Sequence, residues 1–146
     1  MPAPRKTPER ATKVSGATNS TPTTVTSIIV SPNDRHLICL GSNQFNTTSS
    51  PNGTFDPMTV RWSNQEDITN WVPSTSSTSG ETVLTDGTKI IGGVRSRNAI
   101  NIWTDNSLWL MQFTGPPFTF SFRQAGSNCG MIGAHAGVDY NGVSYW

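Results

Sequence analysis

The sequence predicts an all-β protein made of antiparallel four-stranded meanders, and three observations lead to this fold class. Ser, Thr and Asn number 17, 20 and 12 among 146 residues, and Thr favours strands while Ser and Asn favour turns. Thirteen Gly and ten Pro interrupt most stretches before they reach the roughly 10–12 residues of a typical helix. Short apolar runs alternate with turn signals along the chain, which indicates many short strands.

The distribution of charge argues against a nucleic-acid-binding surface on most of the chain. Charged residues make up 13% of the chain, and the formal net charge is +1. Four basic residues fall within the first 13 positions, whereas residues 25–146 carry six basic and eight acidic side chains. Residues 25–146 therefore offer no basic face to a phosphate backbone. The basic N-terminal segment is interpreted as a solvated tail, with weak contact to nucleic acid as the alternative.

Residues 1–24 are expected to form a disordered polar tail, and residues 25–146 are expected to form a β-sheet domain. The tail contains four Pro and almost no large apolar side chain, so it cannot bury enough surface to offset the entropy of ordering. Residues 25–30 and 35–41 are apolar runs that flank a Ser-Pro-Asn-Asp turn signal, which predicts a hairpin.

The segment between residues 42 and 80 predicts mostly irregular structure. Residues 42–58 lack periodicity and are expected to form a long loop, followed by a short strand at 59–62. Ser63 and Glu66 have the spacing of a capping box, which predicts one helical turn that Trp71 packs onto the sheet. Residues 73–80 are expected to form a second polar loop.

Residues 89–123 predict four consecutive antiparallel strands. Gly92 and Gly93 lie in the first of them, where a bulge or a close approach of another backbone is expected. Asp105 and Asn106 form a two-residue hairpin turn, which sets the register of the strands on either side. That register aligns three apolar pairs: Trp103 with Leu108, Ile102 with Trp109, and Ile100 with Met111. Both faces of this hairpin are apolar, so both are expected to be covered.

The next two strand signals extend the pattern. Phe118, Phe120 and Phe122 alternate with polar residues, which predicts a half-exposed outer strand. Asn141 and Gly142 predict a further hairpin near the C-terminus. Its register pairs Tyr140 with Val143, and Val138 with Tyr145.

A four-stranded meander covered on both faces has the form of a β-propeller blade, and residues 25–146 would span about two blades. Since a propeller needs roughly four to eight blades, the chain is expected to be a partial propeller and a fragment of a larger protein. A complete small sandwich is the alternative.

The sequence carries no catalytic, cofactor-binding or metal-binding motif that we recognise. His36 and His135 have no Cys, His or carboxylate at ligand spacing. Cys129 and His135 lie six residues apart with no third group to orient them, which makes a poor nucleophile and base pair. Cys39 is expected to be a buried small hydrophobe, and a disulfide between Cys39 and Cys129 stays open.

Three sets of residues keep a glycan-directed alternative open. The loop carboxylates, which a glycosidase would need as a close pair, are Asp56, Glu66, Asp67 and Asp86. The arginines, from which a sialidase-like carboxylate clamp would draw, are Arg61, Arg95, Arg97 and Arg123, and nothing in their spacing selects three of them. Trp62 and Trp71 are the candidates for stacking on a ligand, although core packing is the favoured role for both.

Three stretches of the chain resemble virion structural proteins of tailed bacteriophages. They are DPMTVRWSNQED at 56–67 followed by NWVP at 70–73, IWTDNSLWLMQFTGPPFTF at 102–120, and NGVSYW at 141–146. The nearest analogy is with the tail or nozzle proteins of short-tailed phages, and the similarity covers residues 37–146. The chain departs from that family in its polar, basic N-terminal segment and in lacking the rest of a propeller.

The resemblance implies a β-propeller in a ring of identical subunits below the portal, which helps to form the conduit for DNA. Its partners would be further copies and other tail and portal proteins, and DNA would pass without sequence-specific contacts. The location implied is the tail of the virion, assembled in the host cytoplasm. The family has no catalytic motif, so no enzyme activity, cofactor or metal is implied, and no apolar run approaches the ~20 residues of a membrane span.

Two other function classes remain as hypotheses. The first is a carbohydrate-binding or glycan-cleaving module of a receptor-binding protein, which would use the tryptophans and loop carboxylates. The second is a cellular protein-interaction propeller, which predicts repeats of roughly 40–50 residues that the chain shows only faintly.

Overall fold

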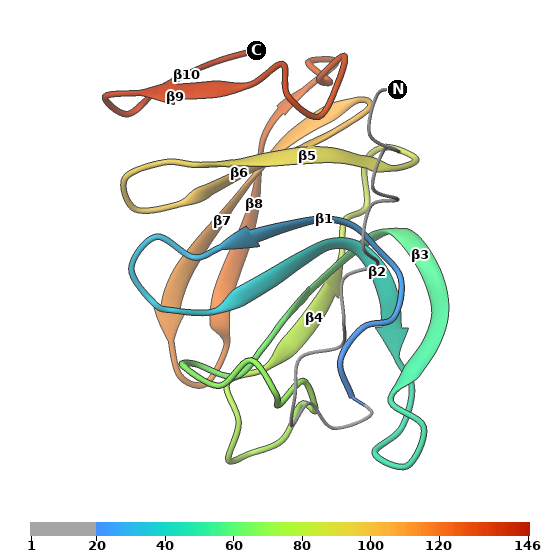
Figure 1. Ribbon diagram of the computed structural model, residues 1–146. Coiled ribbons are helices and arrows are strands. Elements are labelled where there is room, and N and C mark those ends of the chain that lie inside the picture. Colours follow the sequence, from blue (N-terminus) through green and yellow to red (C-terminus); the bar gives the residue numbers. More distant parts are fainter. Residues whose placement is uncertain (1–19) are drawn as a thin grey trace, which may run out of the picture.

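Residues 20–146 form two four-stranded antiparallel sheets and one two-stranded hairpin in a computed structural model of the protein (Figure 1). Each sheet joins its strands in chain order, so both sheets are meanders. The first sheet contains β1 (Val25–Val30), β2 (Leu37–Phe45), β3 (Asn52–Trp62) and β4 (Gly80–Val83). The second contains β5 (Ile90–Arg95), β6 (Ile100–Thr104), β7 (Ser107–Gly115) and β8 (Thr119–Ser127), and the hairpin contains β9 (Val138–Tyr140) and β10 (Val143–Tyr145). The predicted all-β class with antiparallel four-stranded meanders is confirmed.

The structure describes residues 20–146, so most of the predicted tail, residues 1–19, lies outside the described residues. Residues 20–24, which the prediction included in the tail, pack against the first sheet. Backbone N–H groups of Thr23 and Thr24 donate to Asn43 Oδ1 at 3.1 and 2.7 Å, and Ser20 is buried. The packed part of the chain therefore begins before Val25, because buried polar groups of β2 and β3 accept and donate hydrogen bonds there.

The predicted loop at 42–58 is confirmed only for residues 46–51 and is wrong for the rest, because β2 continues to Phe45 and β3 begins at Asn52. Two register shifts interrupt the pairing of these strands, between Leu40 and Ser42 and between Asn43 and Phe45. Each shift breaks the two-residue periodicity on which a strand prediction depends. The sequence of β4 (Gly80–Val83) does not alternate between apolar and polar residues either, so it was not predicted as a strand, although it pairs with β3.

The predicted helical turn at 63–66 is also wrong, and no helix occurs in residues 20–146. Asn64 instead pairs with Asp67 in a short bridge, and Glu66 takes a positive φ of 57°. The Glu66 carboxylate forms an ion pair with Arg35 and is not turned back as a helix cap. Trp71 is buried as expected, although it covers the sheet from a turn and not from a helix.

The second sheet follows the prediction closely. β6 and β7 pair in the predicted register, which places Ile100 opposite Met111 and Trp103 opposite Leu108. β5 has a register shift between Ile90 and Gly92, at the predicted bulge. The C-terminal hairpin also has the predicted register of Tyr140 with Val143 and of Val138 with Tyr145.

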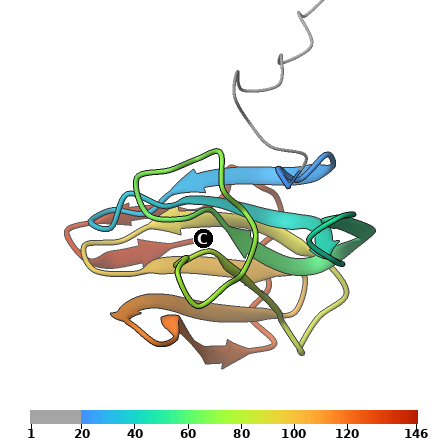
Figure 2. The ribbon, with the colours of Figure 1, turned by 90° about the horizontal axis from the view of Figure 1, so that it is seen from below.

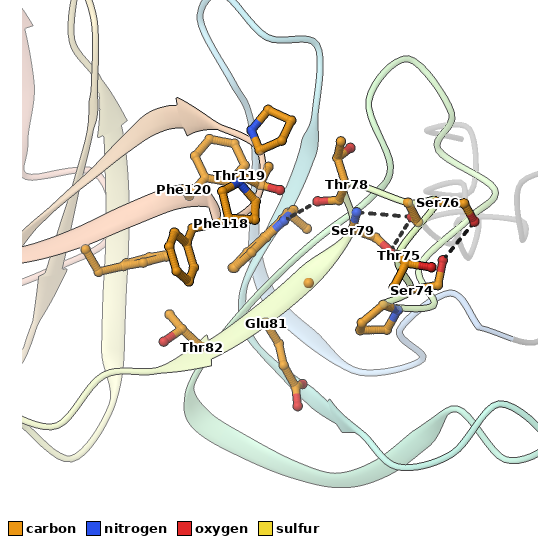
Figure 3. A pocket seen from close by; sticks show the side chains of 17 residues that line it. Ser74, Thr75, Ser76, Thr78, Ser79, Glu81, Thr82, Phe118, Thr119 and Phe120 are labelled. Atoms are coloured by element: carbon orange, nitrogen blue, oxygen red, sulfur yellow. Dashed lines mark hydrogen bonds between the residues drawn. The ribbon is translucent and has the colours of Figure 1, made fainter.

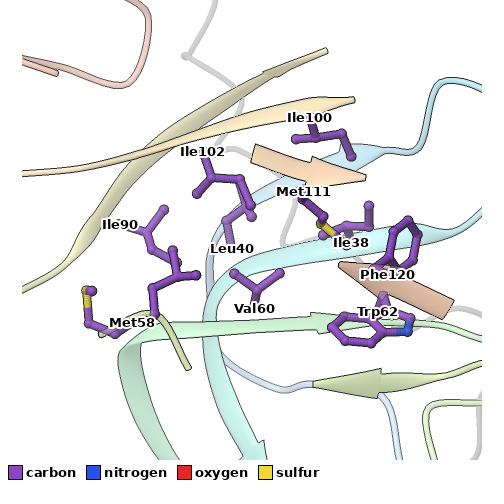
Figure 4. Close-up of a cluster of buried hydrophobic side chains, with 11 residues drawn as sticks. Ile38, Leu40, Met58, Val60, Trp62, Ile90, Ile100, Ile102, Met111 and Phe120 are labelled. Carbon is purple, nitrogen blue, oxygen red and sulfur yellow. The ribbon is translucent and has the colours of Figure 1, made fainter. Parts of the chain in front are cut away.

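The core lies between the facing sides of the two sheets (Figure 4). Alternate residues near the start of β2 and at the end of β3 point into it, and so do alternate residues of β6, β7 and β8 together with Ile90 of β5. A Cβ atom on Gly93 would lie 2.7 Å from Leu40 Cδ1, so this glycine permits the close approach of the sheets that its sequence context predicted. The buried members are Ile38, Leu40, Met58, Val60, Trp62, Leu84, Ile90, Ile100, Ile102, Met111 and Phe120.

Residues 128–146 cover the other side of the second sheet at β5 and β6. All five residues of β6 are buried, and the Trp103 ring lies 5.4 Å from the Trp146 ring. The prediction that this hairpin is covered on both sides is confirmed for β6. The first strands stack in order, because β1 contacts β5 and β5 contacts β9 (Figure 1). Figure 2 shows the stack from below.

Candidate functional site

A groove of about 1010 Å³ lies at one end of the two sheets (Figure 3). Residues 73–79, the second part of the link between β3 and β4, form one wall, and the tip of the β7–β8 hairpin forms the other. Trp62 and Phe122 lie between these walls. The groove therefore joins segments about 40 residues apart in the chain.

The first wall carries a row of Ser and Thr hydroxyls that the local hydrogen bonds hold in place. Asn64 Oδ1 accepts from both the backbone N–H and the hydroxyl of Thr78, at 2.9 Å each. Ser79 donates to the Val72 carbonyl, and Trp62 Nε1 donates to the Thr78 carbonyl at 2.8 Å. A segment without regular secondary structure thus keeps a defined shape against the sheet.

The second wall is apolar and projects from the β7–β8 turn. Pro116 and Pro117 end β7 and hold Phe118 outward, where it is 79% exposed. The strand that follows turns Phe120 and Phe122 toward Trp62, with ring centroids 5.3 and 5.8 Å from the indole. The predicted outer strand therefore holds for Phe120 and Phe122, whereas Phe118 precedes β8 and stands free of it.

The lining of the groove is almost neutral. Glu81 is its single ionisable side chain, and the Glu81 carboxylate accepts a hydrogen bond from the Phe45 backbone N–H at 2.6 Å. Exposed aromatic surface opposite hydroxyl groups suits an uncharged ligand with both apolar and hydroxyl faces.

The structure places both tryptophans named for stacking in the interior. Trp71 is buried and donates from Nε1 to the Ile68 carbonyl at 2.8 Å. Trp62 is also buried, beneath Phe120 and Phe122 and beside Gly80, and contributes only to the floor of the groove. Phe118 is the exposed aromatic residue of the groove, and the Gly-Pro-Pro that precedes it was the available signal that it leaves the strand.

His36 lies beside the groove, buried between the sheets. His36 Nε2 is 3.1 Å from the Thr78 hydroxyl, and that hydroxyl already donates to Asn64 Oδ1. In its neutral form the imidazole therefore donates from Nε2, and Nδ1 forms no hydrogen bond within the described residues. Burial lowers the pKa of His36 below its ordinary value of 6.5. His135 is exposed in the segment before β9, so the structure does not bring the histidines together.

The two cysteines are free, and they lie in different parts of the fold: Cys39 in the first sheet and Cys129 after the last strand of the second. Cys39 is buried in β2, and burial raises the pKa of its thiol to about 12. Cys129 is half-buried in the segment after β8, where its carbonyl accepts from Trp146 Nε1 at 2.9 Å. The open question of a Cys39–Cys129 disulfide is thereby answered: the two thiols are separate.

The carboxylates of Asp56, Asp67 and Asp86 accept hydrogen bonds from side chains and backbone of the fold, and Asp56 lies in β3 and not in a loop. Asp56 accepts from Gln44 and from the Met58 N–H, and Asp67 accepts from Thr69. Asp86 accepts from Asn106 and Gln124, which ties the β4–β5 link to the second sheet. Among residues 20–146, no three His, Cys, Asp or Glu side chains are grouped to hold a metal ion.

The arginines serve different parts of the fold. Arg61 is fully buried, and its guanidinium donates to Asn52 Oδ1, the Ser20 carbonyl and the Trp71 carbonyl at 2.9, 2.9 and 3.2 Å. Arg97 and Arg123 line a separate hollow of about 590 Å³ beside the second sheet. Arg95 ends β5 and is exposed. Arg61 is thus enclosed in the first sheet, away from any surface where it could bind a carboxylate ligand.

In the part of the chain that the structure describes, no helix is long and apolar enough to cross a membrane. Comparison with known proteins adds no relative: no family model matches the chain, and no curated protein matches it.

Proposed function

We propose that this protein is a structural component of a bacteriophage tail that acts through the packing of sheets and subunits, without catalysis. The observation that carries the proposal is the stacking of first strands, in which β1 contacts β5 and β5 contacts β9. In a β-propeller the innermost strands of successive blades are neighbours in the same way. We take the two meanders as two blades and the β9–β10 hairpin as the start of a third.

The buried, ionisable side chains of Arg61 and His36 form structural contacts, which supports a role in packing. The buried guanidinium of Arg61 joins residues 20–24, β3 and the 63–79 segment, so the most enclosed charge in the described chain is occupied by structural contacts. The buried imidazole of His36 packs between Phe113 and Phe120, with ring centroids 5.8 and 5.0 Å away. Both side chains are buried, so solvent and substrate do not reach the atoms that acid–base chemistry would use.

The tail assignment itself rests on the resemblance of residues 37–146 to tail and nozzle proteins. In this role the protein occupies a ring of identical subunits and contacts other tail and portal proteins. DNA passes it without sequence-specific contact, which agrees with six basic and eight acidic side chains in residues 25–146.

Mass spectrometry of purified phage particles, with immunogold labelling of intact virions, tests this function. Peptides of the chain should occur in the particles, and the label should lie at the tail below the portal. The genes beside the coding sequence should include portal and terminase genes. Absence of the protein from purified particles would overturn the proposal.

A second candidate function is the binding of a neutral glycan in the groove, as in a receptor-binding protein. The specific observation is Phe118, an exposed aromatic ring that faces a wall of hydroxyls across a nearly neutral groove. Sugar rings combine apolar faces with hydroxyl edges and match both walls.

Titration calorimetry with maltohexaose, cellohexaose and chitohexaose tests this candidate. Phe118→Ala should weaken binding at least about tenfold, which corresponds to about 1.4 kcal/mol. Phe55→Ala is the matched control, because Phe55 is an exposed aromatic residue on β3 outside the groove. A glycan array without hits, or equal binding by the two variants, would exclude the groove as a glycan site.

A further inference from the structure

The C-terminal hairpin presents its polar side to the protein and its apolar side to solvent. Ser144 and Asp139 point toward the second sheet, where Asn101 Nδ2 donates to Ser144 Oγ at 2.6 Å and Ser144 Oγ donates to Asp139 Oδ2 at 2.9 Å. The opposite side is 52–75% exposed and consists of Val138, Tyr140, Val143 and Tyr145. We call these four residues the forward face. Among residues 20–146 nothing covers the forward face, which leaves four neighbouring apolar side chains exposed.

A second exposed apolar surface lies on β1, at the opposite end of the stack. Ile29 points into the core, so its neighbours point outward, and Ile28 and Val30 are 60% and 48% exposed. We call Thr26, Ile28 and Val30 the backward face. Its position follows from the two-residue alternation of a strand whose inner side already contacts the second sheet.

The two faces continue a geometry that the chain itself repeats. β1 contacts β5 through its inner side, and β5 contacts β9 in turn (Figure 1). The forward face of β9 is the side that a further first strand would cover in the same series. The side of β1 that would receive such a contact is the backward face. None of the seven side chains on the two faces is charged, so bringing them together buries no unpaired charge.

We propose that the forward face of one copy of this chain binds the backward face of a second copy, which builds a head-to-tail assembly. The inference rests on the proposed function as a packing subunit and specifies the surfaces that such a subunit uses. Because the two faces differ, the contact is heterologous, and repeated contacts close into a ring or extend into a filament.

Sedimentation velocity and light scattering on the full chain test the proposal. Tyr140→Asp disables the forward face, and Ile28→Asp disables the backward face. Each variant alone should be monomeric at concentrations where the unchanged protein assembles. A mixture of the two should form dimers and nothing larger, because it retains one intact forward face and one intact backward face. Ile132→Asp is the control, since Ile132 is 98% exposed outside both faces, and it should assemble like the unchanged protein.

Circular dichroism establishes that each variant is folded, and the milder pair Val143→Thr and Val30→Thr replaces any variant that is not. Each milder change should raise the dissociation constant at least about threefold, which is about 0.65 kcal/mol. An unchanged protein that stays monomeric at about 1 mM, or a mixture that forms no dimer, would overturn the proposal. Labelling of virions is independent of this result: a protein found in the tail but monomeric in solution would overturn the head-to-tail contact and leave the tail function standing.

Discussion

Replacing Arg61 with methionine removes the buried charge that joins β3 to residues 20–24 and to the 63–79 link. Its guanidinium donates to side-chain and backbone oxygens of Asn52, Ser20 and Trp71 at 2.9, 2.9 and 3.2 Å, and it contacts the Asn43 carbonyl at 3.4 Å. Methionine preserves most of the length and apolar volume of the side chain, so the main effect is the loss of these hydrogen bonds.

The magnitude follows from the number of oxygens left without a donor. Each hydrogen bond from a charged donor contributes about 1.5–3 kcal/mol, and three short ones are lost. Burial opposes the charged form, as the lowered pKa of Arg61 indicates, so removing the charge recovers part of the cost. Three such bonds amount to roughly 4.5–9 kcal/mol, and the recovered cost of burying the charge reduces this sum, so we expect the free energy of unfolding to fall by about 3–5 kcal/mol.

Urea unfolding monitored by tryptophan fluorescence measures this change. Hydrogen exchange should show the loss first in residues 20–24 and in the 63–72 turn, because Arg61 binds the carbonyls of Ser20 and Trp71. Arg123→Met is the control, since Arg123 is exposed on β8, and it should change the unfolding free energy by less than about 0.5 kcal/mol. A loss below about 1 kcal/mol for Arg61→Met would refute the reasoning that this network holds the segments together.

Three further changes test other parts of the fold. Gly93→Val should lower the unfolding free energy by about 1–3 kcal/mol or more, since a Cβ there would lie 2.7 Å from Leu40 Cδ1, and a melting curve like that of the unchanged protein would contradict the close packing of the sheets. The pKa of His36 is lowered in the folded state, so below pH 6.5 the unfolded chain binds a proton more readily than the folded protein does. The free energy of unfolding should therefore be highest above pH 6.5 and should fall as the pH is lowered below it, by at most about 1.4 kcal/mol per pH unit. His36→Gln should remove that dependence, and an identical slope in both proteins between pH 6.5 and 5 would assign it to another group. At pH 8 a thiol reagent should modify Cys129 in the folded protein but Cys39 only after unfolding, because Cys39 is buried and the pKa of its thiol is about 12; rapid reaction of both would show that β2 opens.

Two hairpins were predictable in detail because their registers depend on local geometry. Two residues, 105 and 106, connect β6 to β7. A two-residue turn fixes which residues of the two strands lie opposite each other, and here it places Ile100 opposite Met111. The pair Asn141 and Gly142 acts in the same way for β9 and β10, with φ of 54° and 83° that favour these residue types.

The long pairing of β2 with β3 was not predictable, because its stability comes from partners distant in the sequence. Asn43 is buried in β2 although it is polar, and it is satisfied by backbone groups of Thr23, Thr24 and Gly53. A polar residue without local periodicity is interpreted as loop when these partners are unknown. The same limit applies to Glu66, whose spacing fits a helix cap while its carboxylate binds Arg35.

The candidate site was less accessible to sequence analysis than the fold. Trp62 and Trp71 attract attention as large aromatic residues, yet both are buried, and the exposed ring at the groove is Phe118. Exposure depends on which segment covers a side chain, and the covering segments here are the β7–β8 strands and the 63–79 link. No local pattern contains that information.

By itself, the sequence determined the all-β class, a four-stranded meander at residues 89–123 whose last strand in fact continues to Ser127, and the two short hairpin registers, because turn geometry and two-residue alternation act between near neighbours. Only the tertiary structure decided that residues 20–24 join the first sheet, that the groove forms between residues 73–79 and Phe118, and that the C-terminal hairpin turns its apolar side to solvent. Those features arise where hydrogen bonds and burial connect residues distant along the chain, and the free energy of such contacts belongs to the packed arrangement and not to any local stretch.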